Sequence, residues 1–491
     1  MCTEVKESVA YMKLLFEPSS VAVVGASNDQ SKWGYRVMSN ILRGGFEGKV
    51  YPVNPGSPEV LGVKSYPRVV DIPEVPDLVV IVVPPPAVPQ VMRDCAAKGV
   101  KVAVVITAGF AEIGGEGERL QQEIVEIARG AGIRFVGPNC LGIMNPHHKL
   151  HPQMPAEFAR PGPLAIISQS GNIMNTVSRL IDTMGFGISK AVSIGNQADI
   201  RAEDYLEYFA HDQQTKVILC YIEGFKDGAR FFRIAKEVSR QKPIVLLKAG
   251  ETPAGARAAH SHTASLAVPD AIVQAMCKQA GIIRVSTLDE LVDTGIAFLR
   301  QPIPKGRRVA IITGGGGWGV LTADACAKLG LDVVTLPKET IEELDAYMPA
   351  WWNRGNPVDF VGGTPRENHL KVVEALLRCP VVDGVIALGL MPPLRRDQLA
   401  AFFNIRQDGQ VSEEFIASVL AQTVDALNGL SDQYGKPIVI AWRQADFGGL
   451  AAEKITRILA ERNSICYELP HEAAAVFARL VEYGEYLKRE E

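Results

Sequence analysis

The sequence predicts an α/β protein made of parallel, doubly wound sheets. Short runs of Val, Ile and Leu alternate with stretches of helical pattern, and the turns after these runs hold Gly, Pro, Asn or Ser. The alternation restarts twice after a proline-containing segment. At roughly 100–200 residues per domain, the 491 residues correspond to about three domains. We therefore expect domains over residues 1–150, 151–300 and 301–491.

Each block has its own set of expected elements. In the first, the strands are Val21–Val24, Val50–Val53, Leu78–Val83, Val102–Ile106 and Phe135–Val136, and the helices include Val88–Lys98 and Glu116–Ala131. In the second, the strands are Leu164–Ile167, Val217–Tyr221 and Pro243–Leu247, and the helices are Asn175–Met184, Ala202–Ala210 and Gly228–Ser239. In the third, the strands are Val309–Ile312, Gly384–Leu388 and Pro437–Ala441, followed by the helix Glu472–Lys488. The expected linkers are His147–Pro163 and Gln301–Arg307.

The composition excludes several classes of protein. Hydrophobic residues make up 47% and charged residues 22% of the chain, as in a globular protein with a large core. A net charge of -4 provides no basic field for nucleic acid. The longest apolar run, near Leu78–Pro86, is too short to cross a bilayer, and no secretory signal opens the chain, so we expect a cytoplasmic protein without membrane contact. The eight cysteines are scattered singly, so we expect reduced thiols and no metal site.

The first candidate site is the turn after Val21–Val24, in the segment VAVVGASNDQSKWG. Gly25 permits a tight turn and a close backbone approach, and the N–H groups at the start of the next helix favour a phosphate. Ser27 stands where the dinucleotide-binding pattern G-x-G-x-x-G has its second glycine. This motif alone leaves two interpretations equally open, nucleotide or CoA binding and an ordinary strand-to-helix turn.

The other strands of the first block end in residues that are typical of turns and ligand contacts. These positions are Asn54, Pro55, Val83, Pro84, Pro85, Ala108, Gly109 and Asn139. Ligands of doubly wound sheets bind at the carboxyl ends of the strands, so the series favours one extended ligand there. Turn chemistry by itself explains any single position.

A second candidate site is the segment SQSGN, residues 168–172, between the strand Leu164–Ile167 and a helix. Its hydroxyls, its glycine and the N–H groups of the helix converge on one point, which suits an anion such as a phosphoryl group. The alternative is a serine that caps the helix with no ligand. The candidate phosphate ligands are Ser168, Ser170, Gly171 and Asn172.

Two more candidates follow the next strands of the second block. Glu223 lies directly after VILCYI, and the Gly- and Ala-rich segment Lys248–Asp270 contains His260 and His262. A neutral imidazole is nucleophilic near pH 7 and can carry a phosphoryl group, and a carboxylate can hold the tautomer of such a ring. From the residues alone, a solvated surface histidine and a surface or capping acid are the commoner interpretations.

The third block has a glycine-rich segment of its own, Thr313–Gly319, which reads TGGGGWG and lies between a strand and a helix. Its backbone N–H groups could hold a second phosphate, and a flexible turn without a ligand is an equal alternative. The segment lacks the Lys-Ser/Thr ending of a P-loop, which excludes a nucleoside triphosphatase of that type.

In their order along the chain, these segments resemble the α subunit of ADP-forming acetyl-CoA synthetase, in the succinyl-CoA synthetase superfamily. The resemblance covers nearly the whole chain. It rests on SVAVVGAS, GKVYPVNP, GVKVAVVITAGFAE, GIRFVGPNCLGIMNP, AIISQSGN, SIGNQADI, TKVILCYIEG, KPIVLLKAGETPAGARAAHSHTASLA and GNPVDF. It implies a Rossmann-type CoA-binding domain followed by two flavodoxin-like parallel-sheet domains.

The resemblance also implies roles for single residues. His262 stands where the family has its phosphorylated histidine, and Glu223 matches the glutamate that supports that histidine. Residues 168–172 match the helix N-terminus that receives the phosphoryl group. The implied contacts to CoA are Gly25, Ala26, Ser27, Lys32, Asn54, Pro55, Val83, Pro84, Pro85, Ala108, Gly109 and Asn139.

The implied reaction is reversible and converts an acyl-CoA, ADP and phosphate into a carboxylic acid, CoA and ATP through acyl phosphate and phosphohistidine. In the family the site for ADP and its Mg belongs to an ATP-grasp module, which is either fused or a separate β subunit. No such module is recognised in this sequence, so we expect a hetero-oligomer with an ATP-grasp β subunit.

Two segments depart from the family's pattern. Ala264 replaces the glycine of SHTG, which would stiffen that loop. Gly314 and Trp318 replace residues of TNAGGPGV, which would reshape the acyl or phosphate pocket and favour a bulkier or aromatic acyl group. The acid, the choice between ADP and GDP, the direction and the stoichiometry stay open.

Two other functions compete with this interpretation. One is a non-catalytic regulatory protein of the same fold that binds CoA or acyl-CoA. The other is a Rossmann oxidoreductase, which is disfavoured because the second strand ends in Asn54 and Pro55, without an acidic residue for a ribose.

Overall fold

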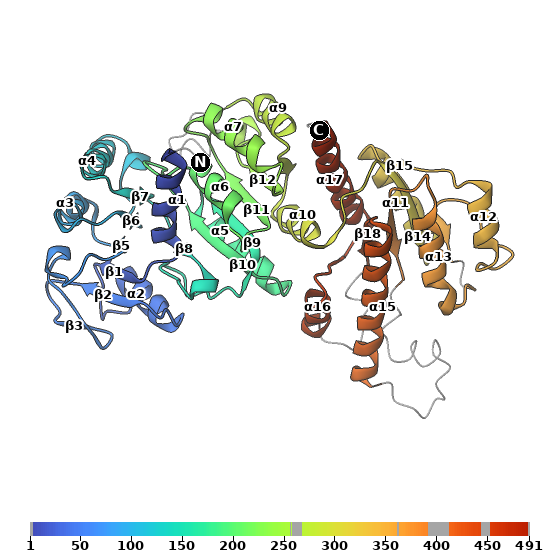
Figure 1. Cartoon of the computed structure of the whole chain (residues 1–491), viewed down its shortest axis with the longest axis horizontal. Helices are drawn as coiled ribbons and strands as arrows, with labels where there is room; N and C mark the ends of the chain where they lie inside the picture. The colour runs from blue at the N-terminus through green and yellow to red at the C-terminus, as the bar shows by residue number, and fades with distance from the viewer. Residues whose placement is uncertain are drawn as a thin grey trace. The chain divides into compact units, whose positions relative to one another are not determined.

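The computed structural model describes residues 3–255, 257, 268–360, 363–390, 412–442 and 452–489. The chain divides into two compact units (Figure 1). Unit 1 consists of Met1–Asp182 and Gly187–Leu291, and unit 2 consists of Thr183–Phe186 and Val292–Glu491. No helix in the described ranges is long and apolar enough to cross a membrane.

The first part of unit 1 is built on a parallel sheet with the strand order β2-β1-β5-β6-β7. The strands are β1 (Ser20–Val24), β2 (Lys49–Val53), β5 (Leu78–Ile81), β6 (Val102–Val105) and β7 (Arg134–Val136), and a small hairpin is formed by β3 (Glu59–Val60) and β4 (Val63–Lys64). The helices are α1 (Thr3–Phe16), α2 (Trp33–Arg43), α3 (Val88–Lys98) and α4 (Glu116–Ala131).

Both faces of this first sheet are covered by helices. Because successive side chains of a strand point to opposite faces, Val21 and Val23 pack with α1 and α2, whereas Ala22 and Val24 pack with α3 and α4. Helices α3 and α4 lie side by side (Figure 1). Aliphatic residues therefore fill β1 from Val21 to Val24, as expected for a parallel strand buried on both faces.

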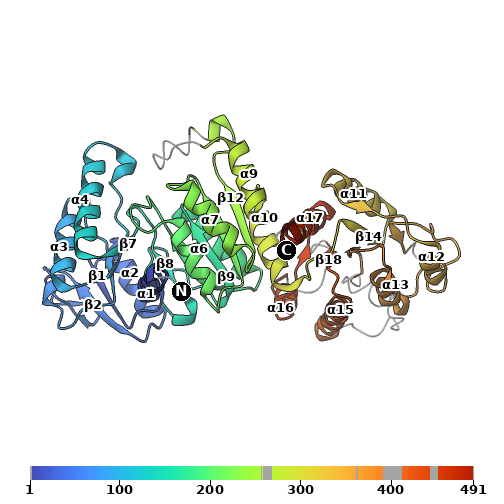
Figure 2. The ribbon, with the colours of Figure 1, turned by 45° about the horizontal axis from the view of Figure 1, so that its top comes forward.

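The second part of unit 1 contains a sheet with the order β13-β12-β11-β9-β10-β8. In this sheet β8 is antiparallel to β10, and the other described pairs are parallel. The strands are β8 (Ile143–Met144), β9 (Pro161–Ser168), β10 (Ile188–Ser193), β11 (Val217–Ile222), β12 (Ile244–Lys248) and β13 (Ile283–Val285). The helices are α5 (Gly171–Thr183), α6 (Ala202–His211), α7 (Gly228–Val238) and α9 (Asp270–Ala280). Helices α6 and α7 pack together over this sheet (Figure 2).

One continuous apolar cluster joins the two sheets of unit 1, from Met12 of α1 through β1 and β9 to Ile282. Polar side chains add to this junction in the segment His147–Pro163, which we expected to be a linker. Asn40 of α2 donates its amide hydrogens to the carbonyls of Gln153 and Pro155, both at 2.7 Å. These contacts hold the segment against α2.

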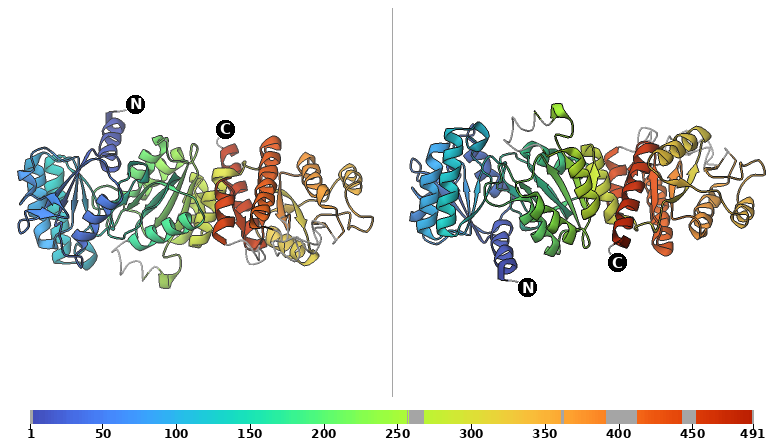
Figure 3. Two further views of the ribbon diagram at one scale, coloured as in Figure 1. Left: turned by 90° about the horizontal axis from the view of Figure 1, so that it is seen from below. Right: turned by 90° about the horizontal axis from the view of Figure 1, so that it is seen from above.

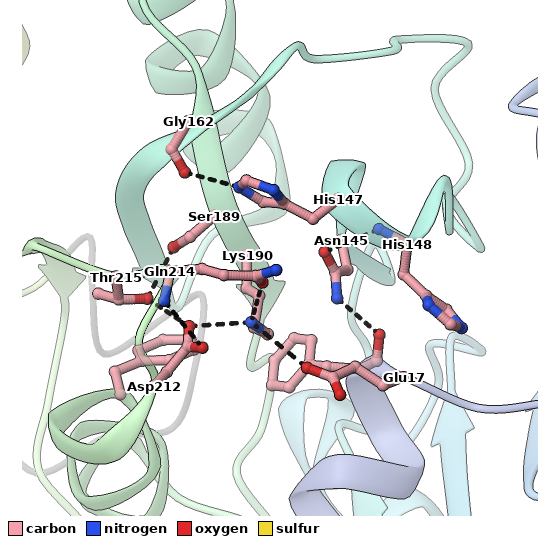
Figure 4. A network of polar contacts seen from close by, with 12 residues as sticks. Glu17, Asn145, His147, His148, Gly162, Ser189, Lys190, Asp212, Gln214 and Thr215 are labelled. Atoms are coloured by element: carbon pink, nitrogen blue, oxygen red, sulfur yellow. Dashed lines mark hydrogen bonds and ion pairs between the residues drawn. The ribbon is translucent and has the colours of Figure 1, made fainter.

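Lys190 is the centre of a buried polar network in β10, a strand that the sequence analysis missed. Its Nζ lies 2.9 Å from Oδ2 of Asp212, 2.9 Å from Oε1 of Gln214 and 3.8 Å from Oε1 of Glu17 (Figure 4). The Lys190 side chain is fully buried. Burial alone would raise the pKa of Asp212, but hydrogen bonds from Thr215 and Lys190 outweigh burial and lower it. A charge inside a strand is thus tolerated because its partners come from other elements.

Unit 2 is built on a parallel sheet with the order β15-β14-β17-β18-β19, to which β16 adds by pairing with β14. The strands are β14 (Arg308–Thr313), β15 (Asp332–Val333), β16 (Val358–Asp359), β17 (Gly384–Leu388), β18 (Ile438–Ala441) and β19 (Cys466–Tyr467). The helices are α10 (Leu288–Arg300), which enters from unit 1, α11 (Gly316–Lys328), α12 (Lys338–Asp345), α13 (Arg366–Arg378), α15 (Glu413–Tyr434), α16 (Ala452–Ala460) and α17 (Pro470–Arg489). Helix α17, red in Figure 3, packs on β17, β18 and α11.

Candidate functional site

A cavity of about 650 Å³ in unit 1 connects the carboxyl ends of the first sheet with the N-terminus of α5. Among the site residues predicted from the sequence, those that line it are Gly25, Lys32, Val83, Pro84, Ala108, Asn139, Ser170, Gly171 and Asn172. The lining residues that the sequence analysis did not single out are Ser31, Trp33, Gly34, Val82, Ile106, Thr107, Cys140, Leu141, Met154, Gln169, Gly195 and Asn196. The first candidate site and the phosphate-binding candidate therefore share a cavity.

The turn between β1 and α2 requires glycine at two positions. Gly25 has φ +91°, and a Cβ there would lie 2.5 Å from the carbonyl oxygen of Val82. A Cβ on Gly34 would lie 1.8 Å from the carbonyl oxygen of Gly25. The start of α2 therefore packs directly on the turn, which is the close helix–strand approach that phosphate-binding turns use. Gly34 fills this role although the G-x-G-x-x-G spacing is absent.

The N-terminus of α2 faces the cavity through Trp33 and Gly34, whereas the N–H of Tyr35 already donates to the carbonyl of Lys32 at 3.2 Å. Its N-cap residue, Lys32, is extended and makes no side-chain capping bond. The N–H groups of a first helical turn have no partner within the helix and favour an anion. Trp33 is 48% exposed beside them, and the guanidinium of Arg36 lies 4.7 Å from its ring centre. A phosphate and a flat ring can both be accommodated here.

Several predicted CoA contacts lie beside the cavity and shape its walls. Asn54 donates to the carbonyl of Ala26 at 2.7 Å, and Oγ of Ser27 accepts the N–H of Asp29 at 3.0 Å. These two side chains stabilise the turn that carries Gly25. The predicted residues that do not line the cavity are Ala26, Ser27, Asn54, Pro55, Pro85, Gly109, Ser168 and Glu223.

The segment SQSGN forms the start of α5. Oγ of Ser168 donates to the carbonyl of Ser170 at 2.6 Å, which shapes the turn into the helix. Gly171 and Asn172 open the helix, so their N–H groups are among those left without an intrahelical partner. The dipole of α5 adds positive potential at the same point. This end of the cavity suits a phosphoryl group.

Gln169 connects this anion site to Glu223. Its side-chain oxygen accepts the N–H groups of Glu223 at 2.9 Å and Gly224 at 3.1 Å, so the strand ends of β9 and β11 are held together. Glu223 is nearly fully buried. Burial and the neighbouring Glu223 carboxylate raise the pKa of Tyr221 to about 12, because both oppose a second negative charge. Glu223 is therefore a buried hydrogen-bond acceptor next to Gln169, which lines the cavity.

The proposed nucleophile itself lies outside the described residues. His260, His262 and Ala264 fall within residues 258–267, which the structure does not describe. The strand that precedes this segment, β12, ends at Lys248. Burial and, to a smaller degree, the positive charge of Arg284 lower the pKa of Lys248. In unit 2, Trp318 lies in the first turn of α11 and is 40% exposed.

A polar junction around Asn196, which lines the cavity, was not predicted from the sequence. The N–H of Asn196 donates to the carbonyl of Pro138 at 2.9 Å, and its Nδ2 donates to Glu112 at 2.6 Å and to Gln121 at 3.0 Å. The other oxygen of Glu112 accepts the N–H of Gly109 at 2.6 Å. These bonds fix the loops of the first sheet against the second sheet. The sequence holds both segments, GFAE and SIGNQADI, without showing that they meet.

Taken together, the glycine turn and the two helix N-termini line a cavity within parallel sheets, and the buried Glu223 is joined to it through Gln169. An α/β protein that binds a long, phosphate-bearing ligand such as a nucleotide or CoA is the class that this arrangement defines.

Comparison with known proteins narrows this class. Three family models match: a CoA binding domain over residues 19–146, a succinyl-CoA ligase like flavodoxin domain over 161–298 and a ligase-CoA domain over 309–426. The chain is 41% identical over 470 residues to the α subunit of ADP-forming acetate–CoA ligase II of Pyrococcus furiosus, covering 96% of this chain and 97% of that one. The chain belongs to the ADP-forming acetate–CoA ligase family.

A longer relative and a solved structure agree with this assignment. The ADP-forming acetate–CoA ligase of Methanocaldococcus jannaschii is 46% identical over 356 residues, which are 72% of this chain and 50% of that protein. This chain therefore matches about half the length of that relative. The acetyl-CoA synthetase 1 of Ca. Korarchaeum cryptofilum, solved with phosphate and ADP, has 34% identity and a TM-score of 0.83 over 98% of both chains. The predicted α/β fold class, a CoA-binding domain with flavodoxin-like ligase domains, is confirmed.

Proposed function

We propose that this chain is the α subunit of an ADP-forming acyl-CoA synthetase, which interconverts acyl-CoA, ADP and phosphate with carboxylic acid, CoA and ATP. An ATP-grasp β subunit, which binds ADP with Mg, would complete a cytoplasmic hetero-oligomer. The observation that carries the proposal is the cavity that joins the glycine turn of β1 to the N-terminus of α5. It offers a site for the CoA phosphates at one end and for the reacting phosphate at the other.

In the first step, a phosphate oxygen attacks the carbonyl carbon of the thioester, the C–S bond breaks and CoA leaves as a thiolate that takes up a proton. The product is an acyl phosphate. The N–H groups of Gly171 and Asn172 at the start of α5 are suited to hold the negatively charged oxygens of the phosphate while one of them attacks. Fixed donors of this kind need no reorganisation during the reaction.

In the second step, a ring nitrogen of His262 attacks phosphorus, and the P–O bond to the acyl group breaks to release the carboxylate. Glu223 accepts a hydrogen bond from the other ring nitrogen and stabilises the charged ring. The burial of Glu223 and the bond from its backbone N–H to Gln169 support this role, because they keep Glu223 next to the segment that opens α5. ADP on the partner then attacks phosphorus, and the P–N bond breaks to give ATP.

The proposal is tested by phosphoryl transfer to the chain. Purified protein is incubated with radiolabelled phosphate and a panel of acyl-CoAs, beside a His262→Asn variant. We expect acid-labile, base-stable label that requires one class of acyl-CoA and is lost in the variant. If no label forms with any acyl-CoA, and none forms with ATP and the ATP-grasp subunit, the chain does not carry a phosphoryl group. Retained CoA binding would then point to a regulatory protein.

A further inference from the structure

Arg284 lies on β13, next to the strand that leads into the segment carrying His262. In the register of the sheet Arg284 pairs with Leu246 of β12, which ends at Lys248. The Arg284 side chain is only 12% exposed. A guanidinium that is buried to this degree is costly unless it is well paired, so the partners of Arg284 indicate its role.

The partners of Arg284 lie on both sides of the His262 segment. Its Nη2 donates to Oε1 of Glu251 at 2.8 Å and to Oδ1 of Asp270. Its Nη1 donates to Oδ2 of Asp270 at 3.2 Å and to Oε1 of Gln274 at 3.0 Å. Glu251 follows β12, and Asp270 is the first residue of α9. One guanidinium thus bridges the two ends of the segment.

The neighbouring cation Lys248 is already engaged by another group. Lys248, the nearest along the chain, directs its Nζ to the carbonyl of Ala249. The carboxylates of Glu251 and Asp270 accept hydrogen bonds from the same nitrogen of Arg284, so they lie close together. Without the guanidinium between them, their like charges would repel. The two ends would then separate.

We propose that Arg284 is a positioning residue that holds the two ends of the His262 segment together and so delivers the imidazole to the acyl phosphate. The inference rests on the proposed function of His262. When the two ends of a chain segment are already held together, fixing its central residue costs less conformational entropy than when the ends are free. A rigid planar fork can serve two carboxylates at once, whereas a lysine ammonium cannot reproduce that geometry.

The test compares Arg284→Gln and Arg284→Lys with a matched control, Arg300→Gln, in the complex with the ATP-grasp subunit. Arg300 is similarly buried, at 16% exposure, and pairs with both oxygens of Asp432 at 2.7 and 2.8 Å in unit 2. Two readouts are taken. The first is the rate of His262 labelling by acyl-CoA and radiolabelled phosphate. The second is CoA release driven by arsenate, which replaces phosphate in the first step and gives an acyl arsenate that water hydrolyses without His262.

We expect Arg284→Gln to slow labelling by about tenfold to a hundredfold, since a misplacement of about 1 Å has effects of that size. Arsenate-driven CoA release and the KM for acyl-CoA should stay at wild-type values. Arg284→Lys should restore labelling only in part, and Arg300→Gln should leave both readouts unchanged.

Three results would overturn the inference. If Arg284→Gln labels at the wild-type rate while His262→Asn does not label, the bridge is unimportant and the proposed function stands. If Arg284→Gln lowers labelling and arsenate-driven release equally, Arg284 is only structural. If the wild-type chain is not labelled, the proposed function fails and the role of Arg284 fails with it.

Discussion

Replacing Gly34 by alanine tests whether the close packing of α2 on the β1 turn builds the CoA site. The added Cβ would lie 1.8 Å from the carbonyl oxygen of Gly25, 2.8 Å from its carbonyl carbon and 3.3 Å from Cα of Ala26. All three obstacles are backbone atoms, so no side-chain rotation relieves the clash. The first turn of α2 must therefore move away by roughly 1 Å or more.

The size of the effect follows from that displacement. Overpacking of a well-packed site costs about 1–3 kcal/mol, and a backbone clash belongs at the upper end of that range. The same movement takes the N–H groups of α2 away from a bound phosphate. We expect the Kd for CoA to rise about tenfold to a hundredfold, which corresponds to roughly 1.4–2.8 kcal/mol.

Calorimetric titration with CoA and urea unfolding measure the two effects. Gly130→Ala in α4 is the matched control, because a Cβ there has no described atom within 4 Å. In an exposed helix this change should raise the free energy of unfolding by about 0.5–1 kcal/mol and leave CoA binding unchanged. The reasoning is refuted if Gly34→Ala binds CoA with the wild-type Kd, or if the control loses affinity to the same degree.

Three further predictions follow from buried or exposed single residues. Lys190→Met should lower the free energy of unfolding, measured in urea, by about 3–5 kcal/mol, because it leaves Asp212 buried without its cation. Adding Asp212→Asn to this variant should recover part of the loss. Burial lowers the pKa of His151 to about 4, so the wild type should lose about 2 kcal/mol as the pH falls from 7 to 5, and a His151→Leu variant should show less of this pH dependence. Binding of CoA should change the tryptophan fluorescence, because Trp33 lines the cavity and is half exposed. If CoA changes the fluorescence of a Trp33→Phe variant as much as that of the wild type, Trp33 does not report on the CoA site.

Much of the fold follows from local sequence. The strands β1, β9, β11 and β12 were predicted because their aliphatic runs and the turn residues after them are properties of a few neighbouring positions. By contrast β10, with the sequence ISKAVS, was missed, since Lys190 interrupts its apolar pattern. Only the folded chain supplies Glu17 and Asp212, which make that lysine tolerable inside a sheet.

The candidate site, like the fold, was predicted from the sequence only in part. The sequence by itself determined that ligand contacts lie at strand ends and helix N-termini, because parallel strands bring their carboxyl ends to one edge. Only the tertiary structure decided that Asn54 supports the turn instead of lining the cavity, and that Gln169, Asn196 and Arg284 hold the site together. Gln169 and Glu223 are 54 positions apart, and Asn196 and Glu112 are 84 apart. Such partners are chosen by strand register and domain packing, which no local pattern of residues records.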